Sequence, residues 1–163
     1  MAKSNNTLCL DKFYPQKDLM ITDIAQQSDK IIIRMKSTSS SCKCPKCNHI
    51  TQKYHGTYTR KVQDLPILGK QVQLEICSHE YACLNDECEA VSIAETFDGF
   101  LNNYSRMTER CADFICTLAL ETSCEGCARV CRTLGIKTSG DTVIRLLLKR
   151  YESLPQPEVS DVI

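Results

Sequence analysis

The sequence lacks a long hydrophobic run, an apolar leader and a net charge. No stretch approaches the roughly 20 apolar residues that span a bilayer, and the N-terminal MAKSNNTLCLDKFYP contains no signal-peptide core. We therefore expect a cytoplasmic protein with no membrane partner. The 20 basic and 20 acidic residues cancel, so net charge favours no partner. With 42% hydrophobic and 25% charged residues, the 163-residue chain has the composition of one ordinary folded domain or two small ones.

Cysteine, in contrast, is abundant, with 12 residues. In a reducing compartment, close cysteine pairs bind a metal more often than they form disulfides. Cys44 and Cys47 enclose two residues, and Cys83 and Cys88 enclose four, each pair in a polar, turn-forming context. Four thiolates form the closed tetrahedral shell that suits structural Zn²⁺. The sequence predicts one structural zinc, whose binding energy folds a small β-module with little core of its own.

The remaining cysteines and histidines are weaker candidates for metal ligands. Those near the two pairs are Cys42, Cys77, His49 and His55, and for each we favour a role without metal. Three more cysteines recur at helical spacing: Cys124, Cys127 and Cys131. Cys111 and Cys116 on the preceding helix are the nearest further thiols. Because cysteine is among the most frequently buried residues, we expect these side chains to pack between helices rather than form a second metal site.

The pattern along the chain predicts an α+β fold with a β-rich first part. Residues 1–41 form an N-terminal segment with one strand, at 30–36. Residues 42–100 form a zinc-ribbon β-module with strands at 54–62 and near 91–97. Val72, Leu74 and Ile76 alternate with polar residues, as in a half-buried strand. We expect a break at Asp64-Leu65-Pro66 and a turn at Gly69-Lys70.

Residues 101–154 change to helical period and predict a three-helix domain. The helices are expected at 104–121, 123–134 and 140–152. Ser123 or Thr122 is the expected N-cap of the second helix, Gly135 ends it, and Ser139 caps the third. The last two helices and their glycine-containing turn have the lengths of a helix-turn-helix. An ordinary three-helix packing unit is the alternative.

Basic residues concentrate on this helical pair. Six lie between residues 129 and 150, against the single acid Asp141. In a helix-turn-helix, the N-terminal part of the second helix faces base edges in the major groove. An arginine there can contact guanine with two hydrogen bonds, and lysines more naturally touch phosphates. The predicted DNA contacts are Arg132, Lys137, Ser139, Thr142, Arg145 and Lys149.

These residues and motifs together resemble the N-terminal half of the zinc-finger-containing DDE-type transposases of bacterial insertion sequences. The resemblance runs in family order over residues 42–154. It is carried by Cys44-Pro45-Lys46-Cys47, His55-Gly56-Thr57-Tyr58-Thr59-Arg60, Asp64-Leu65-Pro66, Gly69, Val72, Cys83, Cys88, Glu95, Phe97, Tyr104, Arg106, Thr108, Arg110, Leu134-Gly135, Ser139, Asp141-Thr142 and Arg145.

The sequence also departs from this family. Ser78-His79-Glu80-Tyr81 stands where the family usually has a basic pair, and Ala90-Val91 replaces the arginine common after the fourth cysteine. Both departures weaken a role for the zinc module in gripping phosphates.

The resemblance implies binding of double-stranded DNA at the terminal inverted repeats of a mobile element. It also implies association with the nucleoid and a homodimer. It also implies that residues 155–163 lead toward a catalytic domain. The carboxylates that would hold Mg²⁺ lie beyond residue 163, so we expect no enzyme activity from this chain. A stand-alone truncated DNA-binding regulator and a zinc-stabilised protein-interaction module are the alternatives. A zinc- or thiol-dependent enzyme is disfavoured, because a four-cysteine shell leaves no open coordination position.

Overall fold

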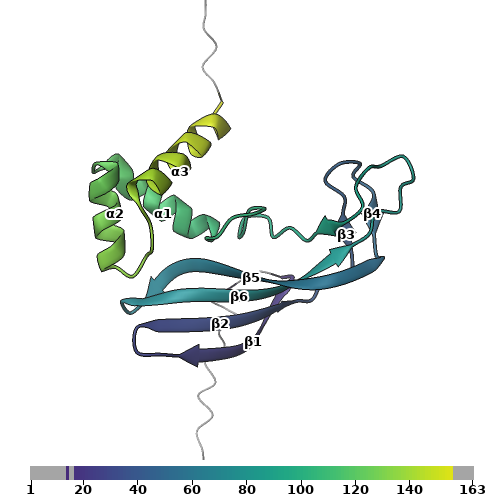
Figure 1. Ribbon diagram of the computed structural model, residues 1–163, viewed down its shortest axis with the longest axis horizontal. Coiled ribbons are helices and arrows are strands. Elements are labelled where there is room, and N and C mark those ends of the chain that lie inside the picture. Colours follow the sequence, from purple (N-terminus) through teal and green to yellow (C-terminus); the bar gives the residue numbers. More distant parts are fainter. Residues whose placement is uncertain (1–13, 15–16, 156–163) are drawn as a thin grey trace, which may run out of the picture.

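The computed structural model describes Tyr14 and residues 17–155 of the chain. It combines a long twisted sheet, a small two-stranded sheet and three helices in one α+β arrangement (Figure 1). The predicted fold class is confirmed at this level, because strands occupy the first part of the chain and helices the last.

The main sheet is built around one long antiparallel hairpin. Its strand order is β1-β2-β6-β5, with β7 also paired to β6. β2 runs parallel to β6, whereas the β1–β2, β5–β6 and β6–β7 pairs are antiparallel. The strands are β1 (Leu19–Gln26), β2 (Lys30–Ser37), β5 (Tyr54–Ile67), β6 (Lys70–Tyr81) and β7 (Ile93–Ala94).

The N-terminal region differs from its prediction in two ways. It contains two strands rather than one, because β1 precedes the predicted strand β2 and pairs with it. β1 is an edge strand with a register shift between Ile21 and Asp23, so its apolar residues do not alternate regularly. β2 in turn pairs with β6 from Lys30 to Lys36. The N-terminal segment therefore belongs to the same sheet as the β-rich region that follows it.

The break expected at Asp64-Leu65-Pro66 is absorbed inside a strand. β5 continues to Ile67, and its register with β6 shifts between Asp64 and Ile67. A bulge tolerates proline, which has no N–H to donate to a ladder. The turn then falls at Leu68 and Gly69, both with positive φ, close to the predicted place. The last predicted strand is shorter than expected, since β7 contains only Ile93 and Ala94.

The apolar face of the sheet carries a larger core than the sequence led us to expect. Alternation along β6 buries Val72, Leu74 and Ile76 completely. The segment after β7 runs back beside the sheet toward α1 (Figure 1). Its aromatic and leucine side chains pack against the apolar face of the sheet. The buried members of this core are Tyr14, Ile33, Met35, Val62, Val72, Leu74, Ile76, Phe97, Phe100 and Leu101. The sheet thus has a hydrophobic core independent of the metal.

Three helices follow: α1 (Glu109–Leu120), α2 (Cys124–Thr133) and α3 (Gly140–Ser153). α2 and α3 lie where predicted, with Ser123 and Ser139 as their N-caps. α1 begins five residues later than the expected Tyr104, at Glu109. The N–H of Gln63 donates to Arg106 and the N–H of Thr108 donates back to Gln63, so this stretch runs beside β5 instead of coiling.

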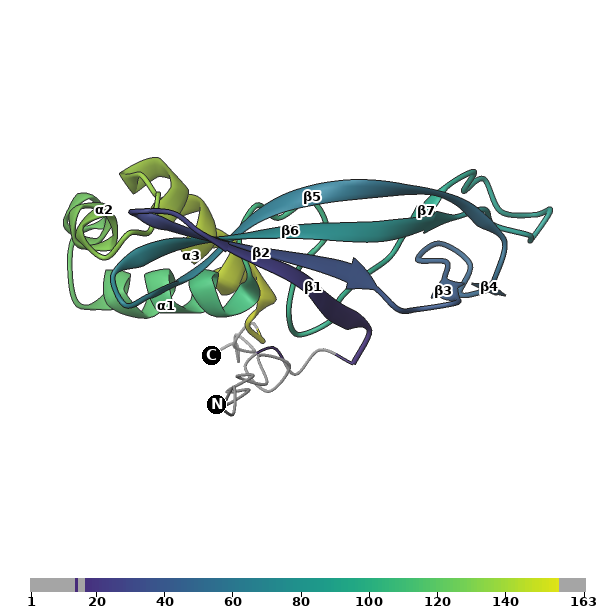
Figure 2. The same cartoon turned by 90° about the horizontal axis from the view of Figure 1, so that it is seen from below.

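The three helices and the small two-stranded sheet lie at opposite ends of the β5–β6 hairpin. The helices lie near its turn, and the small sheet of β3 (Cys42–Lys43) and β4 (Ile50–Thr51) lies at the other end (Figures 1 and 2). Among the described residues, no helix has the length and apolar character needed to cross a membrane.

Candidate metal centre and helical pair

Two tight turns present the four predicted ligands at the end of the sheet. In the first turn, the N–H of Cys44 donates to the carbonyl of His49 and the N–H of Asn48 donates to Cys44, both at 2.9 Å. Asn48 takes a φ of 61°, a left-handed conformation that asparagine tolerates better than most residues. This backbone turn directs Cys44 and Cys47 toward the same point.

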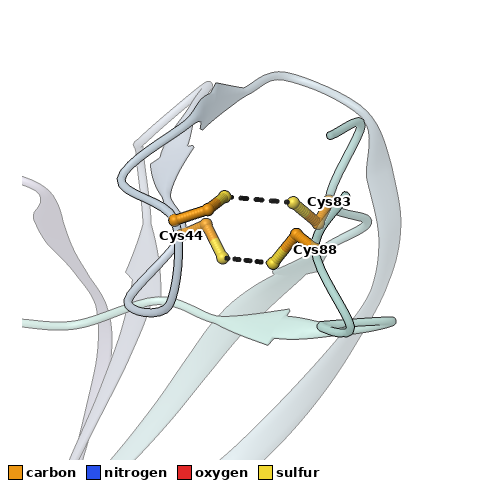
Figure 3. A group of neighbouring side chains, drawn as sticks. Cys44, Cys83 and Cys88 are labelled. Carbon is orange, nitrogen blue, oxygen red and sulfur yellow. Dashed lines mark hydrogen bonds between the residues drawn. The ribbon is translucent and has the colours of Figure 1, made fainter. Parts of the chain in front are cut away.

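The second turn begins directly after β6. The N–H of Cys88 donates to the carbonyl of Asn85 at 2.9 Å. The Asn85 side chain accepts a further hydrogen bond from the N–H of Glu87 at 3.1 Å. An asparagine side chain that caps its own turn in this way is a common loop device. It brings Cys83 and Cys88 to face the first turn (Figure 3).

The four sulfurs have the spacing of a zinc-thiolate tetrahedron. All four Sγ atoms lie within 4.8 Å of one another. The Sγ–Sγ distance is 3.8 Å between Cys44 and Cys88 and 3.7 Å between Cys47 and Cys83 (Figure 3). Tetrahedral Zn–S bonds of ~2.3 Å place neighbouring sulfurs ~3.8 Å apart, far beyond the ~2.05 Å of a disulfide. The donor set fits one structural zinc.

The acidities of the thiols also call for a cation. The backbone N–H of His49 lowers the pKa of Cys47 to about 6. At Cys83, the N–H of Asn85 lowers the pKa, but burial and hydrogen bonding to the other cysteine sulfurs outweigh it and raise the pKa to about 12. The thiolate of Cys47 therefore forms more readily than that of Cys83, which needs a nearby positive charge. A bound Zn²⁺ supplies that charge and keeps its thiolate ligands deprotonated.

The alternative ligands lie outside this group. Among the described residues, the only set of three or more potential ligands close enough to hold a metal is the four-cysteine cluster. Cys42 is buried beside it, with its sulfur against the carbonyl of Lys43. It packs with Tyr81 and Ile93 in a small core next to the site. Zinc and this core together hold the end of the sheet.

The helical cysteines are packing residues, as expected. Cys111, Cys127 and Cys131 are fully buried and belong to the core shared by the three helices. Burial raises the pKa of Cys111 to about 12 and that of Cys131 to about 11. Cys111 and Cys131 are therefore neutral thiols at physiological pH. The sulfurs of Cys127 and Cys131 lie 3.9 Å apart.

The turn between α2 and α3 is docked against the sheet. Gly135 has a φ of 90°, and a Cβ there would lie 3.3 Å from the backbone nitrogen of Gln71. The side chain of Gln63 accepts the N–H of Lys137 at 2.8 Å and donates to its carbonyl at 3.2 Å. Ile136 is buried in the helical core. The sheet thus fixes the turn that precedes α3.

The predicted DNA-contacting side chains lie on the surface of this helical pair. Thr142, Arg145 and Lys149 are three and four residues apart and therefore share one face of α3. Val143 on the other face is fully buried against α1 and α2. Thr142 is half-buried. The exposed members of the predicted set are Arg132, Lys137, Ser139, Arg145 and Lys149.

Sequence reasoning missed the polar contact that joins the helices to the sheet. Asp64 is completely buried. It accepts hydrogen bonds from Thr108 Oγ1 at 2.6 Å and Arg110 Nε at 2.8 Å, and a second one from Arg110 Nη2. Burial alone would raise the pKa of Asp64, but these bonds hold it below its usual value. Both partners lie at the start of α1, so Asp64 fixes where that helix begins.

A second buried carboxylate lies toward the metal end. Glu95 accepts hydrogen bonds from the hydroxyl of Ser37 at 2.8 Å and from the N–H of His79 at 2.7 Å. It connects β2, β6 and the segment after β7. Asp64 and Glu95 both belong to the motifs that carry the family resemblance, and in the structure they act as cross-links between elements.

The comparisons with known proteins bear on the metal end. Residues 40–88 match the family model described as the zinc-finger of transposase IS204/IS1001/IS1096/IS1165. The matched segment contains all four cysteines of the cluster. No curated protein and no solved structure matches the chain. The chain therefore has a zinc-ribbon region similar to the zinc finger of these transposases, and the cluster is its structural zinc site.

Proposed function

We propose that this chain is the DNA-recognition part of a DDE-type transposase, and that it binds the terminal inverted repeats of its mobile element. The observation that carries this proposal is the outer face of α3. There Arg145 and Lys149 are exposed and Thr142 is half-buried, on a helix that follows α2 through a turn containing a left-handed glycine. The zinc-ribbon match supplies the link to transposases.

The assignment of α2 and α3 as a helix-turn-helix gives each exposed residue a role. α3 enters the major groove, with Ser139, Thr142 and Arg145 at the end nearest the base edges. Arg145 has no carboxylate partner among the described residues, so its guanidinium is free to contact guanine. Arg132, Lys137 and Lys149 bind phosphates and set the register of the protein on the duplex.

The zinc module has a supporting role in this proposal. Its four-cysteine shell leaves no position for a reacting water, so the metal is not a catalyst. Strand cleavage and joining require carboxylates that hold Mg²⁺, and we assign no such role to these residues. The described part of the chain binds DNA and positions it for chemistry performed elsewhere in a transposase.

Footprinting tests this function directly. The chain, loaded with zinc, is incubated with a DNA fragment that contains its own gene and both flanks, and protected stretches are mapped. We expect two protected stretches, one on each side of the gene, whose sequences are inverted repeats of each other. Protection distributed evenly over the fragment would contradict end recognition.

A second function is favoured by a different observation on α3. Ile144, Leu148 and Tyr151 recur every three or four residues and are 46%, 56% and 61% exposed. Such a stripe is typical of a helix that contacts another protein. As the alternative function, we propose that this stripe of α3 is the contact surface of a homodimer. Sedimentation of the wild-type chain and of Leu148→Glu separates the two: the stripe is a dimer contact only if the wild type is a dimer and the variant a monomer.

A further inference from the structure

A groove lies where the polar face of the sheet meets the turn before α3. It has a volume of about 470 Å³. Val62 and Met107 are its two apolar lining residues, and most of the others are polar amides or cations: Lys61, Gln63, Gln71, Gln73, Arg106 and Lys137. Thr142, in the first turn of α3, also lines it. The groove therefore joins residues of the sheet to the helix that we propose reads DNA.

Gln63 holds the parts of this groove together. Its side chain makes two hydrogen bonds to the backbone of Lys137, at 2.8 and 3.2 Å. Its backbone N–H donates to Arg106 at 2.8 Å, and its carbonyl accepts the N–H of Thr108 at 2.9 Å. The backbone segments that carry three cations from distant parts of the chain are thus fixed around one strand of the sheet. A backbone held in this way needs little ordering when a ligand binds.

The charge of the groove is positive and largely unpaired. None of its lining residues is acidic. Within the described chain, Arg106 and Lys137 form no ion pair, and Lys61 lies 3.9 Å from Glu75. That carboxylate is also 3.1 Å from Arg34, so it is shared. A pair at this distance whose lysine side chain is 71% exposed is weak. Three cations among amide and hydroxyl donors suit an anion with several oxygens.

We propose that this groove binds the sugar–phosphate backbone of the same duplex that α3 enters, with Lys61 and Arg106 as phosphate contacts. The inference rests on the proposed function and extends it from the helical pair to the sheet. Its physical basis is continuity: Lys137 and Thr142 line the groove and also flank the start of α3. A duplex seated on α3 therefore brings a phosphate strand to the sheet edge.

The test is the salt dependence of binding by single variants. Each phosphate contact releases counterions and contributes about 0.9 to the slope of log K against log salt concentration. Lys61→Gln and Arg106→Gln should each lower that slope by about 0.9. If variant and wild type bind equally at 1 M salt, where phosphate contacts add little, this slope difference weakens binding by each variant about eightfold at 0.1 M salt. The loss should be equal on end duplex and on scrambled duplex.

Lys17→Gln is the matched control. Lys17 is exposed just before β1 and lies outside the groove, so this substitution removes the same charge elsewhere. It should keep the wild-type slope. The proposal is overturned if both groove variants keep the wild-type slope, or if Lys17→Gln loses as much as they do. Far-UV circular dichroism and zinc content must match the wild type in all three.

The two proposals fail in different ways. If the wild type binds end and scrambled duplex equally, end recognition fails, and the slopes on scrambled duplex still decide the groove. If it prefers the ends and the groove variants keep its slope, only the groove proposal fails. Absence of binding to any duplex at low salt overturns both.

Discussion

Replacing Asp64 by asparagine should lower the free energy of unfolding substantially, because Asp64 forms a buried ion pair. The side chain is completely buried and accepts three hydrogen bonds, from Thr108 and from two nitrogens of Arg110. Asparagine keeps the shape but removes the charge and turns one acceptor into a donor facing other donors. Breaking a buried ion pair costs ~3–5 kcal/mol.

The structure lowers that figure, because the Arg110 side chain is 43% exposed. Once unpaired, the guanidinium regains water instead of remaining as an isolated buried charge. We therefore expect Asp64→Asn to reduce the free energy of unfolding by ~2–3 kcal/mol. Urea unfolding with excess zinc, followed by far-UV circular dichroism, measures this difference. A loss below about 1 kcal/mol, the worth of an ordinary hydrogen bond, would refute the structural role of the pair.

The pH dependence of this difference gives an independent check. The folded-state pKa of Asp64 is held below its usual value by the hydrogen bonds of Arg110 and Thr108, against the effect of burial. A lowered carboxyl pKa contributes stability that is fully present above the unfolded pKa of about 4. That stability is lost as pH falls through the folded pKa. The gap between wild type and Asp64→Asn should stay constant from neutral pH to about 5 and narrow below about 4.

Three further predictions concern the metal, the turn and the DNA contacts. Cys83→Ser should lose zinc and the protection of amide hydrogens at the metal end, whereas protection along the core of the main sheet stays. Zinc content and hydrogen exchange measure this difference. Global unfolding would contradict a sheet core that is independent of the metal. Gly135→Ala should cost at least ~1–2 kcal/mol in urea unfolding, because its φ is 90° and a Cβ meets backbone. Gly140→Ala should cost under ~0.5 kcal/mol, because its added Cβ meets only the movable end of an exposed side chain; equal losses would refute this contrast. Arg145→Ala should lose ~1–3 kcal/mol of discrimination at one or two base pairs, and Lys149→Ala should weaken binding equally on all sequences. Titrations against a panel of duplexes with single base-pair substitutions measure both effects. Identical behaviour of the two variants would overturn their assignment.

The metal site and the last two helices are the parts that sequence predicted best. Cysteine spacing within each pair is a local property, and so are the serine N-caps and the glycine that ends α2. None of these needs knowledge of the rest of the fold. For the same reason the pattern identified the alternation along β6 and the turn near Gly69.

The elements that differ from prediction depend on contacts between distant residues. Helical periodicity placed the start of α1 at Tyr104, but hydrogen bonds to Gln63 keep residues 104–108 beside the sheet. Asp64 reads as part of a break, yet it lies inside β5 and pairs with Arg110, 46 residues away. No local period signals such a pair. The same holds for the groove, whose cations come from three separate segments.

The most direct test of the central claim is an equilibrium titration of the zinc-loaded chain against the DNA ends that flank its gene. Scrambled duplex of the same length is the control, and both are measured at two salt concentrations. We predict a preference for the ends that survives the higher salt, because base contacts carry less of the counterion effect than phosphate contacts do. Equal binding to both duplexes, lost together as salt rises, would contradict recognition of the ends by this part of the protein.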